Sequence, residues 1–329
     1  MAVPEAPLPQ KTVAVLGWTG RGKVAELRAS VESILENRRR NGRIWSSGNS
    51  VLVEGPDPLG TAATLGRIPG VSWVAVGLAF PSMKEAGTTA GLLAKRYLKR
   101  GDRFAVAGEG TSGTTGADLA GVVTSGILDA VRGTRVSEPA RLTFRAAADG
   151  SRGVVGVQVM EGPGGTTTGK TWASCLVSGG VHSAVVAWCA LLMGYRVRLV
   201  HVQTSEHSLL AVARIYAELC HRAGPNALKL EVKEGGTIRL LAEHLAALGG
   251  EAFGGFRASG DPAPTGLSEV ISAPLYLMPE EEFSHIFEAL GVKADDSVSD
   301  WSSTAGDGFQ LKEFAGWADD VSAVLDGLR

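Results

Sequence analysis

Apolar residues recur in short blocks along this chain, and the spacing within each block predicts its secondary structure. Short apolar or alternating runs predict strands over residues 12–16, 50–53, 71–76, 103–108, 141–145 and 153–160. Apolar positions that recur every three or four residues predict helices. They are Val24, Leu27, Val31, Ile34 and Leu35 in one helix, and Leu119, Val122, Val123, Gly126, Ile127 and Ala130 in another. A third, basic helix is expected over Leu92–Arg100.

From Thr171 onward, predicted strands alternate with predicted helices, which is typical of a parallel α/β sheet. The helices are expected over residues 183–193, 208–222, 237–248 and 280–290. A glycine follows each helix, at positions 194, 224, 249 and 291, where a C-terminal cap favours a residue with positive φ.

Two segments divide the chain into three parts. Residues 81–91 have the composition of a linker, and residues 161–170 form a connector rich in glycine and threonine. We therefore expect a small α+β part over residues 1–80, a middle part over 81–170 and a parallel α/β part over 171–329. The Pro-rich residues 1–10 lack the apolar core of a signal peptide and are expected to be an unstructured lead-in.

The composition is that of a globular protein, with 329 residues, 44% hydrophobic and 20% charged. The formal net charge of −2 gives no global signal for nucleic-acid binding, so any basic surface must be local. No apolar run approaches the length that spans a membrane. The cysteines, Cys175, Cys189 and Cys220, form no C-x-x-C pair, and their low, odd number favours reduced thiols in the cytoplasm.

The segment Ser174–Ser183 carries the clearest chemical signal in the chain. An apolar run ends in Ser178-Gly179-Gly180, and Ser183 opens a helical pattern. A strand, a glycine-rich turn and a helix together form a phosphate-binding cradle, because glycine permits close approach of the backbone and the N–H groups at a helix start attract anions. Ser178, Gly179, Gly180, Val181 and Ser183 are therefore the candidate nucleotide-binding residues.

A second glycine-rich segment matches a different nucleotide-binding pattern. Gly164–Thr171 fits the Walker A expression G-x-x-x-x-G-K-[ST]. That mechanism needs a helix directly after Lys170, to direct its N-terminus at the phosphates. The residues that follow, Trp-Ala-Ser-Cys-Leu-Val, predict a strand instead, so an interdomain loop is the favoured interpretation.

Basic residues gather near the predicted middle helix. The spacing of Lys95, Arg96, Lys99 and Arg100 would place them on one helical flank, and Arg103 follows. An ordinary solvated surface is one interpretation of this cluster. Contact with nucleic-acid phosphates is the interpretation that we favour.

Histidine and cysteine give weaker signals. All 6 histidines lie between His182 and His285, and none has zinc-ligand spacing with Cys, Asp or Glu, so no metal site is predicted. Cys175 and Cys189 flank the glycine loop and are expected to be small buried apolar residues. A persulfide-carrying role would need exposure and an electropositive environment.

The element order, the connector Gly162–Gly169 and the sequence Leu-Val-Ser-Gly-Gly-Val-His-Ser together resemble the tRNA 4-thiouridine synthetases, the ThiI-type tRNA sulfurtransferases. This resemblance implies an α/β chain with an N-terminal ferredoxin-like α+β domain over residues 1–80. It implies a THUMP RNA-binding domain over 81–170 and a parallel-sheet PP-loop ATP pyrophosphatase domain over 171–329. It also implies ATP, with or without Mg²⁺, as the nucleotide and tRNA as the partner. A separate sulfur-donor protein and a homodimer are open alternatives.

Two departures from that family bear on catalysis. His182 stands where the family has Asp, and imidazole is a poor ligand for Mg²⁺. His182 and Ser183 are nevertheless the residues in the catalytic positions. The chain also has no cysteine after Cys220, where the family uses a late catalytic cysteine. The leading hypothesis is ATP-dependent adenylation of a tRNA uridine followed by sulfur transfer. The alternatives are a non-catalytic RNA-binding relative with a vestigial nucleotide site and, ranked last, an unrelated Walker-type ATPase.

Overall fold

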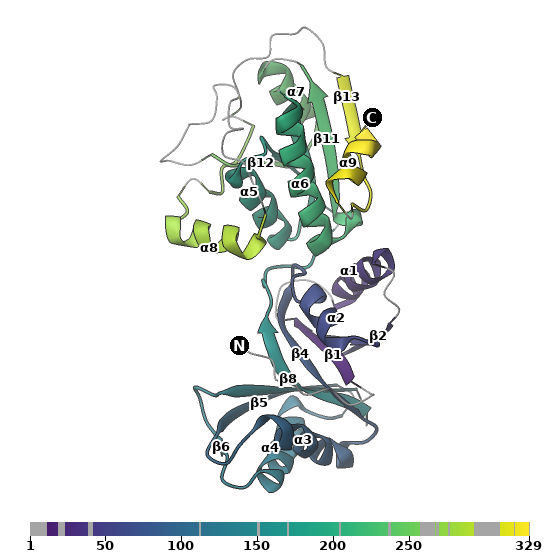
Figure 1. Cartoon of the computed structure of the whole chain (residues 1–329), viewed down its shortest axis with the longest axis vertical. Helices are drawn as coiled ribbons and strands as arrows, with labels where there is room; N and C mark the ends of the chain where they lie inside the picture. The colour runs from purple at the N-terminus through teal and green to yellow at the C-terminus, as the bar shows by residue number, and fades with distance from the viewer. Residues whose placement is uncertain are drawn as a thin grey trace. The chain divides into compact units, whose positions relative to one another are not determined.

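The computed structural model forms two compact units, residues 1–167 and 168–329 (Figure 1). The residues that it describes are 12–18, 24–38, 42–111, 113–149, 152–169, 171–203, 205–235, 238–256, 267, 270–275, 277–292, 310–318 and 320–328. The predicted lead-in, residues 1–10, lies outside them.

The first unit is an eight-stranded sheet with helices packed on it. Its elements are β1 (Thr12–Trp18), α1 (Val24–Asn37), β2 (Arg43–Ser47), β3 (Ser50–Glu54), α2 (Pro58–Leu65), β4 (Val71–Phe80), α3 (Met83–Tyr97), β5 (Arg103–Thr111), α4 (Gly116–Ala130), β6 (Arg135–Val136), β7 (Leu142–Asp149) and β8 (Arg152–Glu161). The strand order is β2-β3-β1-β4-β8-β7-β5-β6.

This sheet runs through both of the parts that the sequence predicts before residue 170. β4 pairs antiparallel with β8, with Val76 opposite Val157 and Phe80 opposite Gly153. α1 and α2 enclose one apolar core with β3 and β4, whereas α3 and α4 enclose another with β5, β7 and β8. The predicted boundary at residue 80 is therefore a change of core within a continuous sheet.

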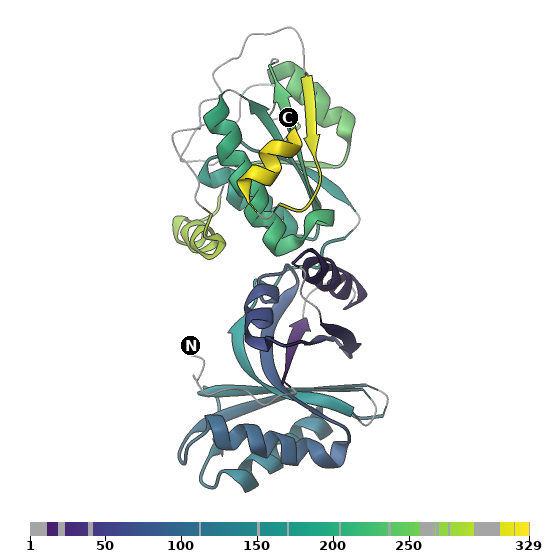
Figure 2. The same ribbon diagram turned by 45° about the vertical axis from the view of Figure 1, so that its right-hand side comes forward.

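The prediction of a linker over residues 81–91 is wrong, because α3 already begins at Met83. The glycines that suggested a linker serve helix packing instead. A Cβ atom on Gly126 of α4 would lie 2.1 Å from the carbonyl oxygen of Gly87, and one on Gly91 would lie 2.9 Å from that of Gly126. α3 and α4 can therefore pack backbone against backbone (Figure 2).

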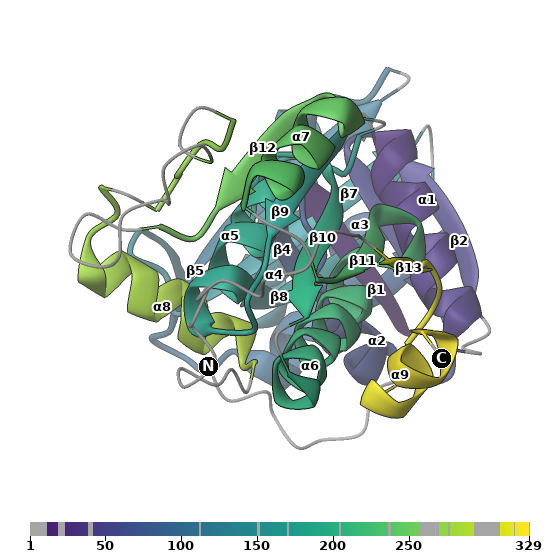
Figure 3. The same ribbon diagram turned by 90° about the horizontal axis from the view of Figure 1, so that it is seen from above.

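The second unit is a doubly wound α/β layer structure. Its elements are β9 (Trp172–Leu176), α5 (Val181–Leu192), β10 (Arg196–Gln203), α6 (Glu206–Ala223), a 3-10 turn (Pro225–Ala227), β11 (Leu228–Glu234), α7 (Ile238–Leu248), β12 (Glu251–Gly254), α8 (Glu280–Leu290), β13 (Gln310–Phe314) and α9 (Val321–Leu328). The strand order is β12-β9-β10-β11-β13, as Figure 3 shows from above. β12, β9, β10 and β11 are parallel, and β13 is antiparallel to β11.

Alternate residues of the parallel strands face two different apolar cores. Cys175 of β9 and Leu199 of β10 pack with α5 and α6, whereas Leu176 and Val200 pack with α7. Such strands must be apolar on both sides, which is why they appear in the sequence as continuous apolar runs. The predicted parallel α/β architecture is confirmed for this unit.

The four predicted helices after residue 170 are confirmed as α5, α6, α7 and α8, with ends shifted by at most two residues. The four glycines that follow them have positive φ, from 60° at Gly291 to 93° at Gly194. The sequence prediction missed β2, α2, β6, β12, β13 and α9.

Candidate nucleotide site

The loop between β9 and α5 lies where an open parallel sheet offers a ligand site. The chain proceeds from β9 through β10 to β11 on one side and then returns to place β12 on the other side of β9. The order of strands therefore reverses between β9 and β12. Ligands of open α/β sheets bind outside the carboxyl ends of the strands at such a reversal. Val177–Gly180 occupies that position.

Hydrogen bonds fix the shape of this loop. The backbone N–H of Ser178 donates to Ser183 Oγ at 2.9 Å, and the two hydroxyl oxygens lie 3.2 Å apart. The backbone N–H of Val177 donates to the carbonyl oxygen of Val200 in β10 at 2.9 Å. Ser183 is 4% exposed, so its hydroxyl is a structural part of the turn.

Gly179 is required by both its backbone and its surroundings. Its φ is +104°, a region that side chains disfavour. A Cβ atom there would lie 2.7 Å from Cβ of Ala211 in α6. The loop therefore lies directly against the second turn of α6.

The N-terminus of α5 is free of capping side chains. Its N-cap is Gly180, no side chain makes a cap hydrogen bond, and the first turn has no acidic residue. Backbone N–H groups at such a helix start attract anions. The predicted residues Ser178, Gly179, Gly180, Val181 and Ser183 thus lie together in one turn at the start of α5, with the Ser183 hydroxyl buried inside that turn.

His182 lies in the first turn of α5, between two later segments of the chain. Its ring centroid is 5.0 Å from that of Phe283 in α8. A Cβ atom on Gly255, just after β12, would lie 2.9 Å from the backbone carbon of His182. The segment after β12 therefore packs against the first turn of α5 at His182.

His201, near the end of β10, supports the loop from below. It is 1% exposed, and its Nδ1 lies 2.9 Å from the carbonyl oxygen of Val177. Because a carbonyl oxygen can only accept, Nδ1 carries the proton. The other ring nitrogen, Nε2, lies 3.2 Å from Ser208 Oγ in the first turn of α6. Burial lowers the pKa of His201 to about 4, so the ring is neutral at pH 7.

The cysteines are buried or partly buried, as predicted for Cys175 and Cys189. Burial raises the pKa of Cys175, and it raises that of Cys189 to about 11, with a further contribution from the nearby Glu282 carboxylate. Burial raises the pKa of Cys220 to about 12. Thiols with such pKa values are protonated at neutral pH, which opposes a persulfide-carrying role.

The described residues contain no group of three or more His, Cys, Asp or Glu side chains that could hold a metal ion. No helix in the described part of the chain has the length and apolar character needed to cross a membrane.

The segment Gly164–Thr171 is not followed by the helix that a Walker A motif requires. β9, a strand, begins at Trp172, as the sequence predicts. The connector also uses its backbone for packing, because the N–H of Gly70 donates to the carbonyl oxygen of Gly164 at 2.7 Å. Lys170 itself lies outside the described residues.

The basic cluster is only partly helical, which corrects the single helical flank predicted for it. α3 ends at Tyr97, and Leu98 is extended, with φ −109° and ψ 145°. Lys95 and Arg96 therefore lie on the last turn of α3, whereas Lys99 and Arg100 lie in the turn before β5. Lys95, Lys99, Arg100 and Arg103 are exposed, and Arg96 is half-buried.

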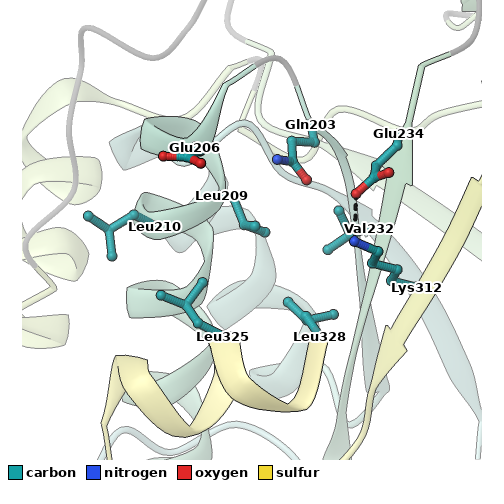
Figure 4. Close-up of a pocket in the computed structure, with 9 residues that line it drawn as sticks. All are labelled: Gln203, Glu206, Leu209, Leu210, Val232, Glu234, Lys312, Leu325 and Leu328. Carbon is teal, nitrogen blue, oxygen red and sulfur yellow. Dashed lines mark ion pairs between the residues drawn. The ribbon is translucent and has the colours of Figure 1, made fainter.

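A separate pocket of about 320 Å³ lies beside α6 (Figure 4). Its apolar lining includes Leu209, Leu325 and Leu328, and an ion pair of 2.8 Å between Glu234 and Lys312 lies along one side. Glu206 and Leu210 line it from the side of α6 opposite Ser208, since residues two apart on a helix point about 200° apart.

Comparison with known proteins shows the fold. No protein-family model and no curated protein matches the chain. The Pyrococcus horikoshii Ot3 protein PH1313 is similar in structure, with a TM-score of 0.68 and 16% identity over 85% of this chain and 100% of that one. A 4-thiouridine synthetase solved as an RNA complex with bound ATP is also similar, with a TM-score of 0.63 and 14% identity over 97% of this chain and 95% of that one.

Sequence reasoning missed His201 and the segment after β12 as parts of the site. His201 sits in an apolar strand, and only the apolar residues on both sides of it signal that its ring is buried. Gly254-Gly255 precedes a stretch with no clear periodicity, so no pattern indicated that it returns to His182.

We predict that His201 makes stability depend on pH. Unfolding restores an ordinary imidazole pKa of about 6.5, so the unfolded chain takes up a proton first as the pH falls. The free energy of unfolding should therefore be highest above about pH 6.5, where His201 is neutral in both states. It should fall by about 3 kcal/mol, through His201 alone, as the pH falls to about 4. Urea unfolding at a series of pH values measures this loss. His201→Asn should flatten the slope, and an unchanged slope in that variant would contradict the assignment.

Proposed function

We propose that this chain is a tRNA-binding protein of the 4-thiouridine synthetase type that holds an adenine nucleotide at the Ser178–Ser183 loop. The proposal rests on the position of the glycine loop. It lies where the strand order reverses between β9 and β12, and it leads into a helix, α5, whose start has no capping side chain. The overall likeness to a 4-thiouridine synthetase solved with RNA and ATP supports it. The assignment of residues 1–80, 81–170 and 171–329 as ferredoxin-like, THUMP and PP-loop domains belongs to the same proposal.

In the proposed reaction, a tRNA uridine oxygen attacks ATP, pyrophosphate leaves, and a sulfur nucleophile then displaces AMP. The N–H groups of Gly180 and Val181, at the start of α5, would hold the phosphates. Cys175 and Cys220 are buried and Cys189 is partly buried, which disfavours them as sulfur carriers, and a separate donor protein is one alternative source of the sulfur. A cytoplasmic location and a homodimer remain predictions.

His182 favours a second candidate, a non-catalytic relative that binds RNA and whose nucleotide site is vestigial. A carboxylate at this place would position Mg²⁺ and stabilise developing charge, effects worth several kcal/mol of barrier. Imidazole replaces neither function well. The two candidates share RNA binding and differ in turnover at the nucleotide site.

We predict that Gly180→Val weakens ATP binding by at least about tenfold, because its side chain would occupy the phosphate position. Isothermal titration calorimetry of the full chain measures the affinity. Gly121→Val is the matched control, since a side chain at Gly121 in α4 meets open space. Lys170→Ala should have little effect. A large loss with Lys170→Ala and none with Gly180→Val would instead support the Walker A interpretation.

We predict that the chain releases pyrophosphate from ATP slowly in the presence of tRNA and Mg²⁺. His182→Asp should raise the rate at least about tenfold, because it restores a carboxylate ligand. His285→Asp, at an exposed position of α8, is the matched control. The second candidate would be rejected if the wild-type chain thiolates tRNA and His182→Asp does not raise its rate of pyrophosphate release. That result would show that His182 does not limit catalysis.

The basic cluster at Lys95–Arg103 predicts tRNA binding through contact with the phosphates of the RNA backbone. Changing Lys95, Arg96, Lys99 and Arg100 to Ala should weaken binding of a tRNA acceptor helix. If all four contact phosphates of the duplex, the slope of log affinity against log salt should become shallower by roughly 3.6. Fluorescence anisotropy over a salt series measures the slope. A control that changes Arg28 and Arg239 to Ala should leave it unchanged, and an unchanged slope in the fourfold variant would reject this surface.

A further inference from the structure

One peptide group of the loop, between Val177 and Ser178, is held from both sides. Its carbonyl oxygen accepts from His201 Nδ1 at 2.9 Å, and its N–H donates to Ser183 Oγ at 2.9 Å. The preceding N–H, of Val177, is bound to Val200 in β10. If the peptide group rotated, both of its hydrogen bonds would be lost, and the carbonyl oxygen would move toward the cradle.

The direction of this peptide matters for an anion. A carbonyl oxygen carries partial negative charge and repels phosphate, whereas backbone N–H groups attract it. His201 removes the carbonyl oxygen of Val177 from the cradle by binding it on the buried side of the loop. Since the ring is 1% exposed, water cannot replace it as a donor to that oxygen.

His201 is itself held in place by the start of α6. Ser208 Oγ lies 3.2 Å from Nε2 and 2.8 Å from the carbonyl oxygen of Ser205, so its one proton can serve the ring or that carbonyl, and Ser208 also forms a reciprocal capping box with Ser205. The N–H of Ser208 donates to Ser205 Oγ at 3.1 Å, and that of Ser205 donates to Ser208 Oγ at 3.2 Å. The contact of Gly179 with Ala211 adds a second point at which α6 supports the loop. The ring orientation is therefore fixed by groups outside the loop.

We infer that His201 is a positioning residue for the nucleotide loop, which it keeps in its anion-binding form by holding the Val177 carbonyl. The inference rests on the proposed function, because it assigns His201 a role in binding the ATP phosphates. His201 does not contact the nucleotide in this account. Its effect passes through the Val177–Ser178 peptide alone.

Two polar substitutions of similar size separate positioning from simple packing. In His201→Asn the amide nitrogen takes about the place of Nδ1 and can still donate to Val177. In His201→Gln the amide nitrogen takes about the place of Nε2, so it reaches toward Ser208 and leaves the Val177 carbonyl unpaired. Both variants place a neutral amide in the same buried site, so a role limited to packing predicts similar effects for both.

The experiment measures ATP affinity by calorimetry and the exchange rate of the Ser178 amide hydrogen by NMR, both on the full chain. His201→Gln should bind ATP more than about tenfold more weakly and exchange the Ser178 amide more than about tenfold faster. His201→Asn should stay within about threefold of wild type in both measurements. The tRNA affinity of both variants should equal that of wild type, which excludes general unfolding as the cause.

Equal effects of the two substitutions, or wild-type affinity and exchange in His201→Gln, would overturn the inference. If wild type binds no ATP, the proposed function fails, and the exchange rate of the Ser178 amide decides the role of His201 on its own. Fast exchange in His201→Gln alone would then support the positioning of the loop, and equal exchange in both variants would overturn it.

Discussion

The turn from β9 into α5 depends on one constraint, the fixed orientation of the peptide between Val177 and Ser178. Its two hydrogen bonds come from different layers of the second unit, one from His201 in the sheet and one from Ser183 in the following helix. The close contact of Gly179 with α6 completes the support. With the backbone held in this way, the start of α5 can face an anion without any capping side chain. The proposed phosphate binding depends on this preorganised backbone, and the side chains of the loop and its neighbours mainly hold the backbone in place.

Close approach of backbone at glycine also occurs elsewhere in the chain, including the segment 81–91 that the sequence predicted to be a linker. Gly87, Gly91 and Gly126 allow α3 and α4 to touch backbone to backbone, and Gly255 allows the segment after β12 to reach His182. At Gly91, Gly126 and Gly255 an added Cβ atom would lie less than 3.0 Å from a neighbouring atom, so something would have to shift, whereas at Gly87 it would make a tight contact of 3.1 Å with the carbonyl oxygen of Val122. A glycine-rich segment is thus ambiguous in sequence, since it indicates either a loop or tight packing, and only the partner segment distinguishes them. That ambiguity explains the incorrect linker over residues 81–91.

Strong local patterns made much of the second unit predictable. Long apolar periodicity gave α5 to α8, and glycine after each helix marked its end. The glycine loop was also predictable, because the pattern that identifies it lies in consecutive residues, 178–183. The contribution of His201 could not be predicted from the sequence, because it depends on how β10 packs beside a loop that lies 24 residues earlier in the chain. β13 and α9 follow a stretch outside the described residues and have short patterns, so local spacing could not place them. The basic cluster was correct as a surface feature but wrong as a helical flank, because α3 ends at Tyr97.

The central claim is that the β9–α5 loop receives the phosphates of an adenine nucleotide. A crystal structure of the full chain with a non-hydrolysable ATP analogue tests it most directly. The account predicts phosphate oxygens about 3 Å from backbone nitrogens of Gly180 and its neighbours in the first turn of α5. It also predicts that the Val177 carbonyl still points to His201. Phosphates bound at Gly164–Thr171, or a nucleotide elsewhere with the β9–α5 loop empty, would contradict the account.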